Sequence, residues 1–207
     1  MTGVNIDASI GLSEVNLKLF KQHGDYSGIE KEKMHELILN SSKSDMEKLV
    51  QIDLSNKNLE PRGVTVISRN FKRTNLQKLD LSMNGMSDES AVEIALNGAW
   101  TNLQELILNA NRISDKGLVA ISANSIWKHL RKLYFKANRV SSLGAASLGM
   151  NSIWKNLEEL DLSQNEIGEE GAIAIGCNAS WRRLKRLDLS FNKIGDKGAE
   201  AIARNYI

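Results

Sequence analysis

Residues Leu157–Ile167, which read LEELDLSQNEI, carry a pattern that recurs along most of the chain and indicates its fold. The same offsets carry apolar residues 27 positions earlier and 27 positions later, and an asparagine stands in nearly every copy. This register continues without an insertion and defines six units, which begin at Leu49, Leu76, Leu103, Leu130, Leu157 and Leu184. Self-similarity at a fixed period predicts stacked supersecondary units that share one core.

Each unit contains a predicted strand followed by a predicted helix. In the first half, leucines alternate with polar residues, which indicates a strand with one buried face. In the second half, two apolar columns three residues apart predict a helix packed by one face; they are represented by Ala172 and Ile175 in the fifth unit. The next column is small in every unit, and we expect it to let the helix approach the strand layer; it comprises Ser68, Ala95, Ser122, Gly149, Gly176 and Ala203.

The motif L-x-x-L-x-L-x-x-N-x-L, carried by Leu157–Ile167, resembles that of the ribonuclease-inhibitor-like class of leucine-rich repeats. That class includes sensor regions of NOD-like receptors, the Ran GTPase-activating protein and effectors of intracellular bacteria. The resemblance implies an α/β leucine-rich repeat solenoid, shaped like a horseshoe, with six 27-residue repeats over residues 46–207. It also implies a protein-binding surface on the concave strand face, and it carries over no catalytic residue.

Residues 1–45 do not fit the repeat and form a separate predicted segment. Helical periodicity after Ser13 and again after Ile29 predicts two helices. Terminal repeats of solenoids need a cover for their apolar side, so we interpret this segment as an N-terminal cap. A separate binding or targeting helix pair is the alternative.

Several further columns predict structural roles. An asparagine after each strand is expected to satisfy backbone groups of adjacent units, and an asparagine at each helix end is expected to adopt a left-handed cap. The tryptophans recur at the repeat spacing and predict a core seam: Trp100, Trp127, Trp154 and Trp181. Cys177 stands in a mostly apolar column, which predicts a small buried side chain.

The residues between the strand leucines show where the array departs from its own background. Asp and Ser occupy these columns in most units, whereas the third and fourth units carry Ile107 and Tyr134 in one column and Asn109 and Lys136 in the next. On neighbouring strands, Ile107 and Tyr134 are expected to lie about 5 Å apart. The predicted partner-binding site comprises Ile107, Tyr134, Asn109, Lys136, Arg131 and Met83. The alternative interpretation is drift at solvated positions.

A third column alternates in charge along five strands and predicts a stabilising ladder; it reads Lys78, Glu105, Lys132, Glu159 and Arg186. The first column places Asp53 beside Asp80 and Asp161 beside Asp188. We expect nearby hydroxyls to offset this like-charge repulsion. Metal binding by these aspartates is a minor alternative.

The sequence lacks the signatures of catalysis and of several partner classes. There is no phosphate-binding loop, H-E-x-x-H motif, G-x-S-x-G elbow or cysteine pair, which predicts a protein without enzyme activity, cofactor or metal. A net charge of +2, and Glu158-Glu159 between two basic stretches, disfavour nucleic-acid binding. The absence of a long apolar run or a signal peptide predicts no membrane contact and a cytoplasmic location, or secretion into a host cell by a dedicated machine.

The function predicted from these features is binding of a partner protein through the concave face of the third and fourth repeats. The alternatives are a regulatory accessory, such as a GTPase activator or an adaptor in a larger complex, and a fragment of a longer leucine-rich repeat protein. The sequence ends at Ile207, one residue short of the next tryptophan position. We therefore expect either further repeats or an open edge that permits end-to-end self-association.

Overall fold

The computed structural model describes residues 50–59, 63–65, 67–68 and 75–205. The predicted N-terminal cap and the last two residues lie outside these ranges. Strands and helices alternate along the chain: β1 (Gln51–Asp53), β2 (Lys78–Asp80), α5 (Asp88–Ala95), β3 (Glu105–Ile107), α6 (Asp115–Ser122), β4 (Lys132–Tyr134), α7 (Ser142–Gly149), β5 (Glu159–Asp161), α8 (Gly168–Gly176), β6 (Arg186–Asp188) and α9 (Gly195–Asn205). Residues 63–65 and 67–68, between β1 and β2, are also helical.

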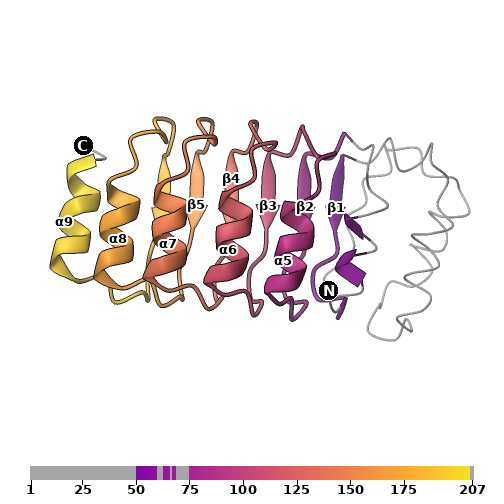
Figure 1. Cartoon of the computed structure of the whole chain (residues 1–207), viewed down its shortest axis with the longest axis horizontal. Helices are drawn as coiled ribbons and strands as arrows, with labels where there is room; N and C mark the ends of the chain where they lie inside the picture. Colours follow the sequence, from indigo (N-terminus) through magenta and orange to yellow (C-terminus); the bar gives the residue numbers. More distant parts are fainter. Residues whose placement is uncertain (1–49, 60–62, 66, 69–74, 206–207) are drawn as a thin grey trace, which may run out of the picture.

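The six strands form one parallel sheet in the order β1-β2-β3-β4-β5-β6. Every pairing joins equivalent positions of successive repeats, for example Leu106 with Leu133. Figure 1 shows the strands in one row and the helices in another, as the strand–helix repeat predicts. The middle residue of β1 to β5 is buried while its two neighbours point away from the core. The fold is therefore a two-layer solenoid with an open sheet face on one side and helices on the other.

The core lies between these layers and contains the predicted leucine and tryptophan columns. Trp100, Trp127 and Trp154 are completely buried, and Trp181 is nearly so. The prediction of a tryptophan seam is thus confirmed. In the last repeat, Leu187 and Ile202 are only half-buried, because among the described residues no further repeat covers them.

The asparagine after each strand joins two repeats, as predicted. The side chain of Asn111 accepts hydrogen bonds from the backbone N–H groups of Asn84 (3.1 Å) and Met86 (3.0 Å). Its amide donates to the carbonyl groups of Leu81 and Leu108 at 3.2 and 3.0 Å. Equivalent bonds are made by Asn84, Asn138, Asn165 and Asn192.

The asparagines at the helix ends do not adopt the predicted left-handed conformation. Their helices end in residues with right-handed backbone conformation. The asparagine side chains bond to the preceding repeat and to the loop after their own helix. Asn97, for example, donates to the Ser68 carbonyl (2.7 Å) and accepts from the N–H of Ala99 (2.8 Å). The left-handed residues instead follow the strands and include Met83, Ala110, Ala137, Gln164 and Phe191.

The prediction that Cys177 is buried is wrong, because its side chain is exposed. Its column follows the last turn of each helix and points away from the sheet. Leu96, Met150 and Ala123 in the same column are exposed as well. The residues of this apolar column therefore lie on the solvent-exposed surface of the helix layer.

The column of small residues serves contacts between helices rather than contacts with strands. A Cβ atom added to Gly149 would lie 2.4 Å from the Ala174 carbonyl oxygen in α8. A Cβ atom added to Gly176 would lie 2.7 Å from the carbonyl carbon of Ala201 in α9. The backbones of α7, α8 and α9 consequently approach closely, which corrects the expectation of helix-to-strand contact.

Candidate protein-binding surface

The sheet register places Ile107 directly opposite Tyr134 on β3 and β4. Both side chains are half-buried on the open sheet face, where their neighbours in other repeats are aspartates. Asn109 and Lys136 follow two residues later in their own repeats. We call these four residues, Ile107, Asn109, Tyr134 and Lys136, the central sheet cluster.

The aspartates that Ile107 and Tyr134 replace have a structural role. In the other repeats, the carboxylate accepts the backbone N–H two residues later, as Asp80 does from Ser82 at 2.9 Å. The same bond is made by Asp53, Asp161 and Asp188. Of the hydroxyls expected to offset charge repulsion, that of Ser190 donates to Asp188 at 2.7 Å. All four aspartates thus accept a backbone N–H, and Asp188 also accepts the expected hydroxyl.

The central sheet cluster carries its own replacement for one of these bonds. Tyr134 cannot accept the N–H of Lys136 as an aspartate would. Instead, the side-chain oxygen of Asn109 accepts that N–H from across the strand gap at 2.9 Å. The change from Asp to Tyr in the fourth repeat and the change from Ser to Asn in the third are thus linked by one hydrogen bond.

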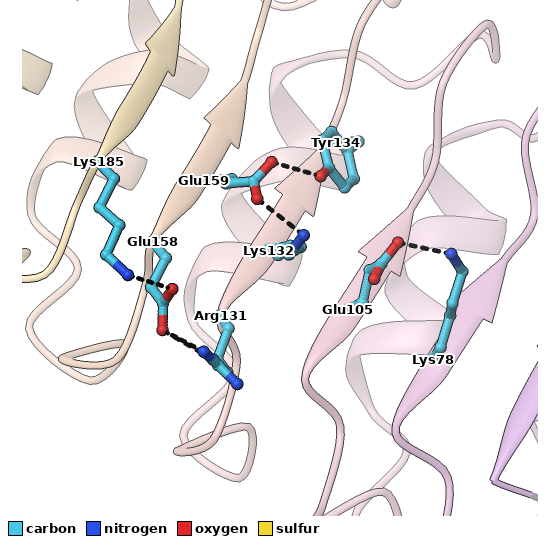
Figure 2. A network of polar contacts seen from close by, with 8 residues as sticks. All are labelled: Lys78, Glu105, Arg131, Lys132, Tyr134, Glu158, Glu159 and Lys185. Atoms are coloured by element: carbon cyan, nitrogen blue, oxygen red, sulfur yellow. Dashed lines mark hydrogen bonds and ion pairs between the residues drawn. The ribbon is translucent and has the colours of Figure 1, made fainter.

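Tyr134 is held in place by a charged pair on the sheet face. Its hydroxyl donates to Glu159 at 2.7 Å, and Lys132 Nζ lies 2.7 Å from the other carboxylate oxygen (Figure 2). The hydrogen bonds from Lys132 and Tyr134 hold the pKa of Glu159 below its usual value. Burial, followed by the Glu159 hydrogen bond, raises the pKa of Tyr134, so the phenol stays protonated. An aromatic ring fixed in this way is pre-organised for contact with a partner.

The predicted charge ladder divides into pairs. The register makes its residues neighbours, and Lys78 Nζ lies 2.8 Å from Glu105. The second pair is Lys132 with Glu159, whereas Arg186 lies 4.0 Å from Asp188 in its own strand. The ladder thus stabilises the sheet locally and also orients Tyr134, a role that the alternation of charge did not indicate.

Arg131 lies apart from the central sheet cluster. It precedes β4, about 10 Å along the chain from Tyr134, and forms an ion pair with Glu158 at 2.6 Å. Lys185 contacts the other oxygen of Glu158 at 2.9 Å (Figure 2). This bridge partly neutralises the two basic stretches. Arg131 is therefore not part of the central sheet cluster.

Met83 lies in the turn after β2 rather than on a strand. It has a left-handed backbone (φ 58°), its side chain is 57% exposed, and its N–H donates to the Asn109 carbonyl at 2.9 Å. The backbone of Met83 is thus tied to Asn109 of the central sheet cluster, and its side chain is exposed. The equivalent turn of the last repeat carries Phe191, which is 80% exposed and which the sequence reasoning did not consider.

We predict that Asp80→Asn stabilises the protein at pH 7. Burial and the neighbouring Asp53 carboxylate raise the pKa of Asp80 above its ordinary value of 3.8, against the lowering effect of the Ser82 bonds. Stability from such a group is present at low pH and is lost as pH rises through the native pKa. Asparagine keeps an acceptor without charge, so we expect a gain of about 0.5 kcal/mol at neutral pH and none near pH 3.

Asp188→Asn is the matched control, because hydrogen bonds from Ser190 lower the pKa of Asp188. Its contribution is present above the unfolded pKa and is lost as pH falls. Thermal unfolding is measured for both variants at pH 7 and near pH 3. At pH 7, Asp80→Asn should raise the unfolding temperature and Asp188→Asn should lower it. Equal shifts would contradict the assigned electrostatics.

The described part of the chain presents no helix long and apolar enough to cross a membrane. Within the same residues, no group of three or more His, Cys, Asp or Glu side chains has a geometry that could hold a metal ion.

Comparison with protein families supports the fold. Four segments match the family model described as Leucine Rich repeat: residues 72–95, 101–122, 155–176 and 182–203. A solved structure of the tropomodulin C-terminal domain from Caenorhabditis elegans is similar at 17% identity and a TM-score of 0.47, over 86% of this chain and 93% of that chain. No curated protein matches the chain significantly. The parallel register and the family matches show the fold of a leucine-rich repeat solenoid, and proteins with this repeat generally mediate protein–protein interactions.

Proposed function

We propose that this protein is a non-catalytic interaction module that binds a partner protein through its open sheet face, centred on the third and fourth repeats. The observation that carries the proposal is the paired replacement of two structural aspartates by Ile107 and Tyr134 at one register position. The motif resemblance supports assignment of the repeats to the ribonuclease-inhibitor-like class.

The hydrogen bonds around Ile107 and Tyr134 favour a binding surface over random sequence drift. Random loss of an aspartate would leave a backbone N–H without its acceptor, at a cost of about 1–3 kcal/mol if it were buried. Here Asn109 supplies the acceptor for Lys136, and Glu159 orients the Tyr134 hydroxyl. Two unrelated contacts thus support the exchange.

The chemistry of the surface indicates the kind of partner surface that fits. Ile107 and the Tyr134 ring offer apolar contact area, and Lys136 adds an exposed cation. Met83, whose backbone bonds to Asn109, is a further exposed apolar side chain. Aromatic residues surrounded by polar groups are typical centres of binding energy in protein interfaces. We therefore propose a partner with an apolar projection next to an acidic group.

The test is partner capture with the wild-type chain and with the double variant Ile107→Asn, Tyr134→Asn. Asparagine at the second position can accept the Lys136 N–H, as aspartates do in the other repeats, so the fold should survive. We expect the variant to bind any specific partner at least tenfold more weakly, because truncation of central contacts typically costs about 2 kcal/mol or more.

Phe191→Asn is the control variant. It removes an exposed aromatic side chain from a turn outside the central sheet cluster, at a left-handed position that asparagine tolerates. Circular dichroism verifies folding of all three proteins, and calorimetry with the purified partner measures affinity. Unchanged affinity in the double variant, or an equal loss in Phe191→Asn, would overturn the proposed site.

A further inference from the structure

Helix α7 differs from its neighbours on the side of the molecule opposite the open sheet face. Ser142–Gly149 contains no charged residue, whereas α5, α6, α8 and α9 each contain at least two. Leu143 is 69% exposed, and Met150, directly after the helix, is 77% exposed. Seven residues apart, the two side chains lie on the same helix face, with Ala146 between them. An apolar surface thus crosses the middle of the helix layer.

Two rows of side chains extend this surface over the neighbouring helices. The row through Met150 is formed by Leu96, Ala123, Met150 and Cys177, all of which are exposed. Val119 on α6 is also exposed and adds to it. The row through Leu143 is charged on both sides of α7 and reads Glu89, Lys116, Leu143, Glu170 and Lys197. The apolar centre therefore has a charged border along one side.

The order of these charges is self-complementary. A two-fold axis parallel to α7 places the third repeat of one copy opposite the fifth repeat of another. Lys116 then faces Glu170 of the second copy, and Glu89 faces its Lys197. Each of these two contacts occurs twice in such a dimer, because both halves of an isologous interface are the same patch. A row with equal signs on both sides of Leu143 would repel its own copy.

The contacts within one chain leave these charges available. Lys116 Nζ lies 4.0 Å from Glu89, and both side chains are about 70% exposed. Lys197 Nζ lies 3.5 Å from Glu169 and is also largely exposed. Exposed pairs of this kind contribute little, about 0–1 kcal/mol, so they exchange readily for contacts across an interface.

We propose that the α7 surface binds a second copy of this chain in a two-fold symmetric dimer. Leu143 packs on Leu143 of the other copy and Met150 packs on its Met150, while the four charged contacts set the orientation. The helix layer forms the interface, so both open sheet faces remain accessible. The dimer would present two central sheet clusters on opposite sides.

The first test is the oligomeric state of the full chain by sedimentation equilibrium, with Leu143→Lys and the control Phe191→Lys. We expect a concentration-dependent dimer for the wild type and the control, and a monomer for Leu143→Lys, because two lysines would meet at the axis. Thermal unfolding monitors the fold of each variant. A monomeric wild type at its highest soluble concentration overturns the proposal. So does a dimer that survives Leu143→Lys, which would indicate association through another surface, such as the edge at β6.

A charge exchange tests the orientation without altering the apolar centre. Lys116→Glu alone and Glu170→Lys alone each place two like-charge contacts in the dimer, and each should raise its dissociation constant about tenfold. An equimolar mixture of the two variants restores opposite charges in the mixed dimer, as does the double variant. Recovery of wild-type affinity in both samples supports the two-fold arrangement. Failure to recover, with both proteins folded, overturns it.

Discussion

Replacement of Asn111 by alanine is expected to lower the free energy of unfolding by about 3–5 kcal/mol, because each buried polar group left unpaired costs roughly 1–3 kcal/mol. The side chain is buried and satisfies the backbone N–H groups of Asn84 and Met86. Its amide also donates to three carbonyl groups, those of Leu81, Leu108 and Asn109. Alanine leaves the two N–H groups inside the turn without an acceptor. The three carbonyls each keep a second donor, namely the Asn84 amide, the Asn138 amide and the Met83 N–H.

Urea denaturation of the full chain measures this effect, and Asn156→Ala is the control. The Asn156 amide also donates to a carbonyl of the preceding repeat, that of Lys128 at 2.9 Å, but on an exposed surface where water can replace it. We expect a change within about 0.5 kcal/mol for the control, as for most surface substitutions. Similar losses for both variants would show that burial does not decide the contribution of these asparagines.

Gly149→Ala is expected to destabilise the protein by about 2 kcal/mol, although alanine is the better helix former by about 1 kcal/mol. The added Cβ atom would lie 2.4 Å from the Ala174 carbonyl oxygen and 2.7 Å from its carbonyl carbon. These are backbone atoms of α8, so relief requires the two helices to separate. That separation would weaken the packing of Leu148 and Ile175 beneath them.

Gly98→Ala separates the steric effect from the general effect of adding a methyl group. No other part of the described structure lies within 4 Å of a Cβ atom at Gly98. We expect this variant to be neutral or slightly stabilising in the same urea experiment, since alanine reduces the entropy of the unfolded chain. A stabilised Gly149→Ala variant would contradict the close helix approach.

Strand pairing could be predicted because a repeat array has one register. Once Leu106 and Leu133 occupy equivalent positions, their strands pair at that position, and Ile107 must lie opposite Tyr134. The same reasoning predicted the tryptophan seam and the asparagine after each strand. In each case, a residue and its copy 27 positions later have the same environment, so the column itself carries the information.

Positions at the ends of elements were predicted less well. Cys177 belongs to an apolar column, but composition does not indicate which side of a helix end points toward the sheet. Asn97 was expected to bend its own backbone, yet it bonds to Ser68 in the preceding repeat. A column of equivalent residues shows that a contact is repeated in every unit. The neighbouring repeat determines which atoms make that contact.

The candidate site also combines features that the sequence predicts with features that it does not. The departure of the third and fourth repeats from the Asp and Ser background can be seen in the sequence, because that comparison needs only the alignment of the units. Three contacts could be seen only in the folded chain: Asn109 accepts the Lys136 N–H, Glu159 orients Tyr134, and Glu158 pairs with Arg131. These contacts join adjacent repeats, and their partners depend on strand spacing and on the direction of each side chain. For the same reason, the exposed apolar surface of α7 could not be predicted from the sequence and is seen only in the folded helix layer.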